Sequence, residues 1–257
     1  MQKHPNNTSW NQVAPWYNKI VGQTGHYYHE HIVIPGVLRL LNLKSSDSLV
    51  DFACGQGVLA RHIPLIKKYL GLDLAKDLIK TANSQNHQSN FEFMTCDLRK
   101  VLRERTEKFD KAAIILALQN IDPVANVIKN AANYLKKGGQ LIIVLNHPAF
   151  RIPRQSAWQI DEKNKQQQRV INRYLSPIKI PIEMNPGENS QHKNKKITWS
   201  FHHSLQDYSQ MLHENGFVIE KIEEWVSDKE SVGKAAAMEN RARAEIPLFM
   251  AILAKLS

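Results

Sequence analysis

The stretch from Leu49 to Arg61 restricts the fold more than any other part of this 257-residue chain. It is a short apolar run that breaks at Gly55 and Gly57 and continues with helical periodicity, which predicts a strand, a tight turn and a helix. Glycine adopts positive φ readily and lets a ligand approach the main chain closely. Such a turn presents backbone N–H groups and a helix N-terminus at the carboxyl edge of a sheet, where open α/β folds bind nucleotide-like ligands.

The glycine spacing alone leaves the ligand open, because Gly-x-Gly-x-x-Ala also fits a nicotinamide dinucleotide fingerprint. Three acidic residues help to discriminate between cofactors. Asp51 precedes the glycines, where a pyrophosphate has little use for a negative charge but a cationic ligand does. Asp73 ends the second apolar segment, where a carboxylate accepts ribose hydroxyls, and Asp97 ends the third, at the level of an adenine amino group. Three successive predicted strands therefore end in carboxylates.

In these motifs the chain resembles the class I S-adenosylmethionine-dependent methyltransferases. The resemblance covers roughly residues 48–146 and is carried by Asp-x-Ala-Cys-Gly-x-Gly at 51–57, Leu72-Asp73, Cys96-Asp97-Leu98 and Leu-Lys-Lys-Gly-Gly-Gln-Leu-Ile-Ile at 135–143. It implies an α/β, Rossmann-like fold. The sheet would have seven strands, mostly parallel with an antiparallel last strand, and helices on both faces.

The resemblance also implies an enzyme that binds S-adenosylmethionine and releases S-adenosylhomocysteine. Asp51 would lie near the methionine end of the cofactor and Asp73 would bind its ribose. The full set of implied cofactor residues is Asp51, Ala53, Gly55, Gly57, Asp73, Leu74, Asp97, Leu98, Leu116, Gln119 and Tyr17.

Short apolar runs alternate with helical patterns through the middle of the chain, which is typical of βαβ units. We predict strands near 48–53, 68–73, 90–96, 110–117 and 139–146. Asp122-Pro123 is a helix start, and Gly138-Gly139 is expected to end that helix. Later in the chain, Ser204 is expected to cap a helix that Gly216 ends. Three further strand-like runs lie at 197–201, 217–222 and 247–253.

Two segments fall outside this alternation. Residues 1–47 are predicted to form an N-terminal helical cap on the methyltransferase domain, residues 48–257, with Tyr17 and Tyr28 facing the pocket. The alternative is that their aromatic residues only dock the helices on the sheet. Residues 147–200 carry ten lysines and arginines against four acidic residues and are predicted to be an inserted, partly irregular substrate lid.

Methyl transfer requires a nucleophile held in line with the methyl group, and a hydroxyl nucleophile also benefits from a base. His147 follows the fifth predicted strand and is a candidate base, as is His29. Either histidine has a structural alternative. Tyr28, Arg151 and Arg154 are candidate substrate-pocket residues, although such arginines often hold the base of a loop. No compact spacing of ligands indicates a metal site.

The identity of the acceptor is left open. Residues 119–122 lack the Asn/Asp-Pro-Pro-aromatic turn of enzymes that methylate exocyclic amines, so we favour O, N or C of a small molecule. The excess of 34 basic over 24 acidic residues keeps an RNA acceptor as an alternative. A non-catalytic scaffold that only binds the cofactor also fits the motifs, and an NAD(P)-dependent oxidoreductase is the least favoured hypothesis.

Composition predicts a cytoplasmic protein that does not enter a membrane. No apolar run approaches the roughly 20 residues needed to span a bilayer, and the first residues lack a signal-peptide core. Cys54 and Cys96 are expected to be unpaired thiols. Either a monomer or a homodimer is compatible with these features.

Overall fold

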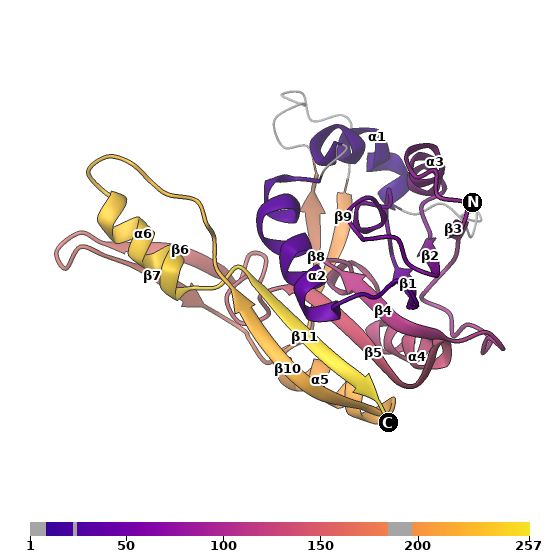
Figure 1. Cartoon of the computed structure of the whole chain (residues 1–257). Coiled ribbons are helices and arrows are strands. Elements are labelled where there is room, and N and C mark those ends of the chain that lie inside the picture. Colours follow the sequence, from indigo (N-terminus) through magenta and orange to yellow (C-terminus); the bar gives the residue numbers. More distant parts are fainter. Residues whose placement is uncertain (1–8, 23–24, 185–196) are drawn as a thin grey trace, which may run out of the picture.

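The computed structural model describes residues 9–22, 25–184 and 197–257. Its centre is a seven-stranded sheet in the order β10-β11-β5-β4-β1-β2-β3 (Figure 1). The strands from β3 to β5 are parallel, and β11 runs antiparallel to both β5 and β10. The α/β fold expected from the motifs, with its antiparallel last strand, is confirmed.

The strands lie close to the predicted runs. Their bounds are β1 (Ser48–Phe52), β2 (Lys68–Asp73), β3 (Phe91–Thr95), β4 (Phe109–Ile115), β5 (Leu135–Asn146), β10 (Phe217–Trp225) and β11 (Phe249–Leu256). All five residues of β1 are buried, because helices cover the central strands on both sides.

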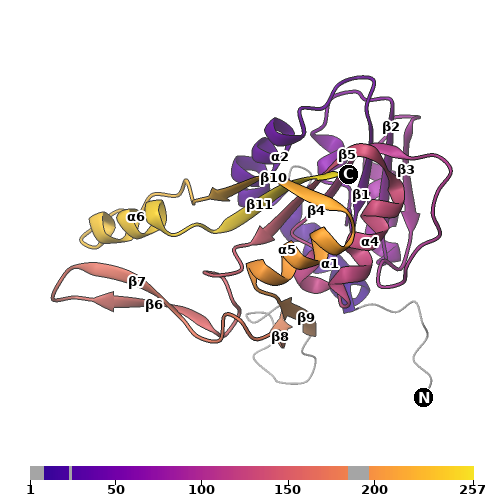
Figure 2. The ribbon, with the colours of Figure 1, turned by 90° about the horizontal axis from the view of Figure 1, so that it is seen from below.

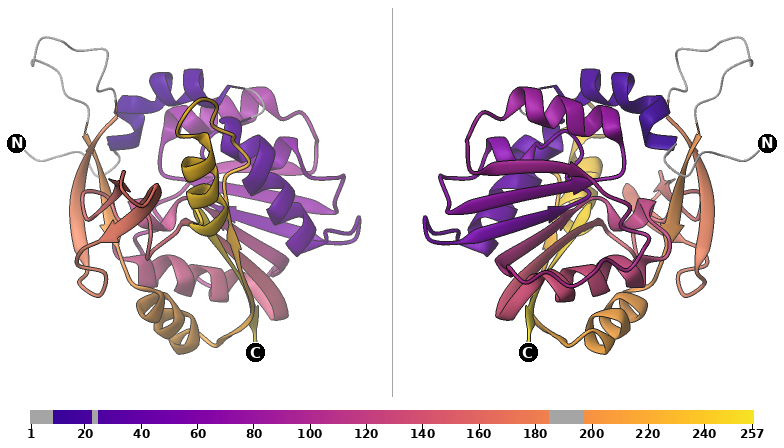
Figure 3. Two further views of the ribbon diagram at one scale, coloured as in Figure 1. Left: turned by 90° about the vertical axis from the view of Figure 1, so that its left-hand side faces the viewer. Right: turned by 90° about the vertical axis from the view of Figure 1, so that its right-hand side faces the viewer.

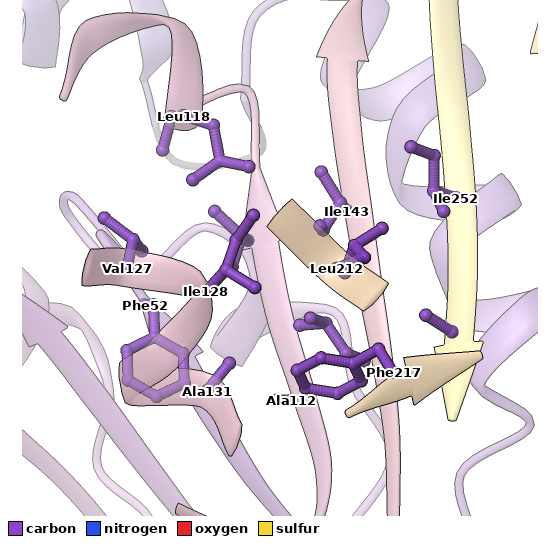
Figure 4. Close-up of a cluster of buried hydrophobic side chains, with 14 of the residues drawn as sticks. Phe52, Ala112, Leu118, Val127, Ile128, Ala131, Ile143, Leu212, Phe217 and Ile252 are labelled. Carbon is purple, nitrogen blue, oxygen red and sulfur yellow. The ribbon is translucent and has the colours of Figure 1, made fainter. Parts of the chain in front are cut away.

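Helices pack on both faces of the sheet (Figure 3). One face carries the π-helix η1 (His29–Val33), α2 (Ile34–Leu41) and α3 (Lys76–Gln85), with α1 (Ser9–Val21) packed on α3. The other carries α4 (Val124–Tyr134) and α5 (Leu205–Glu214), whose apolar side chains meet the sheet in Figure 4. Within the described residues, no helix is both long and apolar enough to cross a membrane.

The prediction that Gly138-Gly139 ends the helix after Asp122-Pro123 is wrong. That helix, α4, ends at Tyr134, and Leu135 already pairs with Phe109 on β4. The next pair joins Lys111 to Gln140, so residues 136–139 form an irregular bulge within β5. The two glycines serve this bulge: Gly138 has a φ of 78°, and a Cβ on Gly139 would lie 2.8 Å from the Lys136 carbonyl oxygen.

Ser204 caps α5 as predicted. Its hydroxyl accepts a hydrogen bond from the Asp207 N–H at 3.2 Å, and the Asp207 carboxylate accepts one from the Ser204 N–H at 2.8 Å. This reciprocal arrangement is a capping box. Gly216, with a φ of 78°, follows the helix. The cap fixes residues 203–207 at the start of α5, which matters for the pocket described below.

The insertion after β5 contains more regular structure than its sequence suggests. It forms two hairpins, β6 (Ser156–Asp161) with β7 (Gln166–Ile171) and β8 (Ile178–Glu183) with β9 (Ile197–His202). The β6–β7 hairpin extends away from the sheet beside α6 (Ala236–Glu245) (Figure 2), where Arg241 donates to the Lys165 carbonyl at 2.9 Å. The β8–β9 hairpin instead contacts α1 and the 3₁₀ turn η3 (Leu118–Asn120) after β4. Residues 185–196 of the insertion lie outside the described part of the chain.

Candidate cofactor and acceptor site

The glycine turn after β1 leaves open space at one position and is tightly packed at another. Gly55 has a φ of 56°, and a Cβ built on it would meet no atom within 4 Å. Gly57 has a φ of 75°, and its Cβ would lie 2.9 Å from Asn86 Nδ2 and 3.0 Å from the Phe93 ring. Ala53, with a φ of 59°, adopts the same left-handed conformation at the end of the strand. Gly55 therefore offers bare backbone to a ligand, whereas Gly57 is needed for packing.

Asp73 connects the ends of the first two strands. Its Oδ2 accepts a hydrogen bond from the Gly55 N–H at 2.9 Å, and its Oδ1 accepts one from the Ala75 N–H at 2.7 Å. Burial raises the pKa of this carboxyl, and the backbone N–H groups act in the opposite direction. The pair of bonds holds the carboxylate beside the open glycine.

Asp51, on the strand that precedes the same turn, is a buried carboxylate. It is 3% exposed, and Tyr69 donates a hydrogen bond of 2.6 Å to its Oδ2. Burial raises the pKa of Asp51 to about 7, although the hydrogen bond from Tyr69 favours the charged form. A buried carboxyl that ionises near neutral pH is well suited to pair with a cation.

Asn130 on α4 shapes the turn that follows β3. This fully buried side chain donates to the carbonyls of Leu98 and Lys100 at 3.2 and 2.9 Å and accepts from the Leu102 N–H at 2.7 Å. Asp97 lies in the same turn, and its carboxylate is bound by the guanidinium of the neighbouring Arg99. Leu98 is buried, so the turn presents Asp97 at the edge of the sheet.

The N-terminal helices reach this edge at two points. Gln56 donates to the Gly22 carbonyl at 2.9 Å, which ties the glycine turn to the end of α1. Tyr17 on α1 lies near Asp73, and burial together with the charge of Asp73 raises the pKa of the phenol to about 12. Tyr28 lies further along the edge, packed on Phe249 with ring centroids 5.7 Å apart.

The turn after β4 carries an unsatisfied buried group. Leu116 has a φ of 52°, and its carbonyl accepts from Gln119 Nε2 at 3.2 Å and from Asn120 Nδ2 at 3.3 Å. Gln119 Oε1 is buried and has no hydrogen-bond partner among the described residues. Buried carbonyl oxygens are usually paired, so this atom is a candidate contact for a ligand.

A small cavity of about 30 Å³ adjoins this turn. The β5 end, the following loop, β9 and the start of α5 line it through Gln119, Asn146, Pro148, Arg151, Pro153, Ser200, Phe201, His202, His203 and Tyr208. Arg154, exposed and with a φ of 59°, is not among the lining residues. A larger hollow of about 420 Å³ lies at the opposite edge, around Lys68 and Phe91, away from the glycine turn.

His147 uses both ring nitrogens within the protein. Its Nδ1 accepts from the Ala149 N–H at 3.2 Å, which assigns the proton to Nε2, and Nε2 donates to Glu224 at 2.7 Å. Neither nitrogen is then available to an acceptor. His29 lies against Gly25 and Val58, and burial lowers its pKa to about 4. Both ring nitrogens of His147 are thus engaged within the protein, whereas Nδ1 of His29 is buried without a hydrogen-bond partner among the described residues, so the role of base stays a prediction for these histidines.

His203 and Asp207 were not among the sequence-derived candidates, although the structure brings both to the cavity region. The Nδ1 atom of His203 lies 4.0 Å from Asp207 Oδ2. The sequence contained one signal for His203, which is its position directly before the cap of the helix that follows the insertion. Among the described residues, no group of three His, Cys, Asp or Glu side chains could hold a metal ion.

The site fits S-adenosylmethionine in three respects. Gly55 leaves room for a ligand against the backbone. Asp51 can balance a positive charge, and Asp73 lies on the neighbouring strand end with its carboxylate fixed for hydroxyl groups.

Comparisons with known proteins concern the central domain and the fold. Residues 50–143 match the family model described as "Methyltransferase domain". The chain is 31% identical over 103 residues to the ribosomal protein L11 methyltransferase of Staphylococcus saprophyticus, covering 39% of this chain and 32% of that protein. It is 24% identical over 147 residues to the demethylmenaquinone methyltransferase of Porphyromonas gingivalis, covering 52% and 60%. The chain thus spans less than two thirds of these curated relatives.

Among solved structures, an S-adenosylmethionine-dependent methyltransferase from Mesorhizobium loti superposes with a TM-score of 0.65 at 24% identity, covering 86% of this chain and 96% of that one. The likeness therefore extends beyond the matched domain to most of the fold. The domain match identifies residues 50–143 as a methyltransferase domain, and the likeness to solved structures shows that the chain has the class I S-adenosylmethionine-dependent methyltransferase fold.

Proposed function

We propose that the protein transfers a methyl group from S-adenosylmethionine to O, N or C of a small-molecule acceptor. The observation that carries the proposal is the open position at Gly55, which is bonded to the half-buried Asp73, with the buried Asp51 close enough to feel the charge of Asp73. A cationic, ribose-bearing ligand matches this combination, whereas a dinucleotide pyrophosphate would meet the negative charge of Asp51.

The bound cofactor would supply an electrophilic methyl group. Asp51 would lie near its methionine end, and Asp73 would bind the ribose hydroxyls, with Tyr17 covering them. Asp97 would face the adenine. The other residues that would contact the cofactor are Ala53, Gly55, Leu74, Leu98, Leu116 and Gln119, whereas Gly57, also a predicted contact, would serve the packing of the turn. The main contribution of the chain would be to align donor and acceptor, since in-line displacement depends chiefly on position.

The acceptor would bind where the turn after β4 meets the insertion. Arg151 lines the cavity there and forms no ion pair with any described residue. An uncompensated guanidinium suits a carboxylate or phosphate on the acceptor. Tyr28 and Arg154 would lie further out. In this arrangement, α1 and η1 would cap the cofactor, and of the insertion only the loop after β5 and the strand β9, which line the cavity, would act as a lid.

The names of the relatives mention both ribosomal protein L11 and demethylmenaquinone, so relatives of this domain differ in acceptor class. The excess of basic residues keeps RNA as the second candidate.

Isothermal titration with S-adenosylmethionine, S-adenosylhomocysteine, NAD and NADP tests the cofactor. We expect micromolar binding of the first two, lost in Asp73→Ala and retained in Asp77→Ala, a matched control on the exposed first turn of α3. Labelled methyl transfer to a small-molecule library, with total RNA and ribosomal protein in parallel, then tests the acceptor. Binding of NAD instead of the sulfonium pair would overturn the cofactor, and transfer to RNA alone would overturn the acceptor class.

A further inference from the structure

His203 lies at the cavity through the geometry of its own helix start. It directly precedes the α5 cap, and its ring packs edge-on against Tyr208 with centroids 5.9 Å apart. The 4.0 Å separation between Nδ1 and Asp207 Oδ2 is within ion-pair range. Gln119 lines the same cavity from the turn after β4. The imidazole therefore lies where the β4 turn and the insertion meet.

Two other histidines near the cavity, His202 and His147, are already engaged. His202 is buried and bonds to the Tyr174 carbonyl at 2.6 Å, and His147 is held by Glu224 and Ala149. In contrast, no described residue forms a hydrogen bond with Nε2 of His203. This nitrogen is therefore available to a molecule in the cavity.

The charges around His203 suit a group that gains a proton and then holds it. Burial lowers the pKa of the imidazole, so the ring is neutral and able to accept a proton near pH 7. Of its neighbours, His202 on β9 also lowers the pKa, whereas Asp207 on α5 and Asp122 after η3 raise it. The two carboxylates would stabilise the imidazolium once it forms.

We propose that His203 is the catalytic base for an acceptor that carries a hydroxyl group, and that Arg151 binds an anionic group on the same molecule. The inference rests on the proposed function. The acceptor oxygen forms the new bond to the methyl carbon, and the carbon–sulfur bond breaks with its electron pair going to sulfur. The hydroxyl proton passes to Nε2 of His203 and later to solvent. Gln119 Oε1, which lacks a partner among the described residues, accepts a hydrogen bond from the bound acceptor.

A binding experiment tests this site without turnover. The probe is 4-hydroxybenzoate, added to the full-length protein with S-adenosylhomocysteine and ¹³C-labelled histidine. We expect the His203 Cε1–H resonance to shift on addition, and that of His213, exposed at the far end of α5, to stay in place. Arg151→Gln should weaken binding of the probe by about tenfold. An unchanged His203 resonance at saturating probe would overturn the inference.

Activity with paired acceptors separates a base from a structural residue. A thiol such as 4-mercaptobenzoate is largely ionised at pH 8 and needs no base, whereas 4-hydroxybenzoate does. His203→Gln should lower kcat for hydroxyl acceptors by about 10²- to 10⁴-fold and leave the thiol within about threefold. His213→Gln should change neither rate.

An equal loss of kcat for both acceptors, or no loss for either, would contradict the role of His203 as the base. If the wild-type protein binds S-adenosylmethionine but methylates none of 4-hydroxybenzoate, salicylate and 3-hydroxybutyrate, the hydroxy-acid class is wrong while the cofactor assignment stands. Failure to bind S-adenosylmethionine would count against the proposed function itself.

Discussion

Tyr69 donates a hydrogen bond of 2.6 Å to Asp51, and their residue exposures are 0% and 3%, so neither side chain is solvated. The two residues belong to neighbouring parallel strands, where Asp51 pairs directly with Gly71, two residues beyond Tyr69. A carboxyl group in this position ionises against the cost of desolvation, which Tyr69 only partly offsets. The pair therefore links the protonation of the glycine-turn region to the stability of the sheet.

The stability of the protein should fall as pH rises through this carboxyl's titration range. The pKa of Asp51 is about 7 in the folded protein and near 3.8 when unfolded, so between these values the folded state binds the extra proton. Rising pH then lowers the free energy of unfolding, by at most roughly 4 kcal/mol. Urea denaturation at pH 5 and pH 8 should show the fall in the wild type and a flatter profile in Asp51→Asn. Tyr69→Phe should raise the pKa further, and a pH profile identical in all three proteins would contradict this assignment.

Two glycine substitutions should separate binding from packing. Gly57→Ala places a methyl group 2.9 Å from Asn86 and 3.0 Å from Phe93, so it should destabilise the protein by roughly 2 to 4 kcal/mol. Gly55→Ala meets no neighbour and should cost only about 1 kcal/mol of backbone strain. Titration should nevertheless show that Gly55→Ala loses more S-adenosylmethionine affinity, per kcal/mol of stability lost, than Gly57→Ala does. If the two variants lose the same affinity per kcal/mol of stability lost, Gly55 does not face the ligand.

Asn130→Ala should destabilise the turn beside Asp97. The change leaves two carbonyls and one N–H without their partner, at an expected cost of roughly 2 to 4 kcal/mol. Asn133→Ala is a matched control on the same helix, since the side chain of Asn133 makes one hydrogen bond, to the Leu102 carbonyl at 3.2 Å. Chemical denaturation measures both. A cost for Asn130→Ala no larger than that of Asn133→Ala would mean that solvent replaces the three bonds.

Gly36 allows α2 to pack directly on the indole of Trp225. A Cβ at this position would lie 2.5, 2.6 and 2.9 Å from three atoms of the ring. Alanine normally favours a helix interior over glycine by about 1 kcal/mol, but here overpacking should give a net destabilisation of roughly 1 to 3 kcal/mol. In the Trp225→Leu background, where the indole is absent, Gly36→Ala should cost less stability than it does in the wild type. Thermal unfolding would refute the clash if Gly36→Ala proved more stable than the wild type.

The strands of the sheet could be predicted because each is marked by a local sequence pattern. Val50 and Leu70 lie in short apolar runs that are buried on both sides, and each run ends at a turn signal. The cap of α5 was equally local, since Ser204 and Asp207 are three residues apart. The end of α4 was not, because Gly138 and Gly139 resemble a helix stop and only pairing with β4 makes them a bulge.

The structure of the insertion and of the acceptor side could not be predicted from local sequence patterns, because it depends on contacts between distant segments. The polar strand β7 pairs with β6 and packs beside α6, a helix more than 60 residues further along the chain. Likewise, the position of His203 acquires meaning only when the fold brings it to Gln119, 84 residues earlier in the sequence. The carboxylates on the cofactor side could be listed in advance because consecutive strand ends meet at one edge of a parallel sheet.

The left-handed backbone at Ala53 and Leu116 costs stability, and the side chains of these residues explain why it is kept. Each residue directly follows one of two adjacent strands, and each adopts a φ that costs a side-chain-bearing residue about 1 kcal/mol or more. Glycine would relieve both costs, yet it would also remove the methyl group of Ala53 and the isobutyl group of Leu116 from the two hydrophobic clusters that they pack against on opposite faces of the sheet. The protein therefore retains a strained main chain at two strand ends where the side chains contribute to the core.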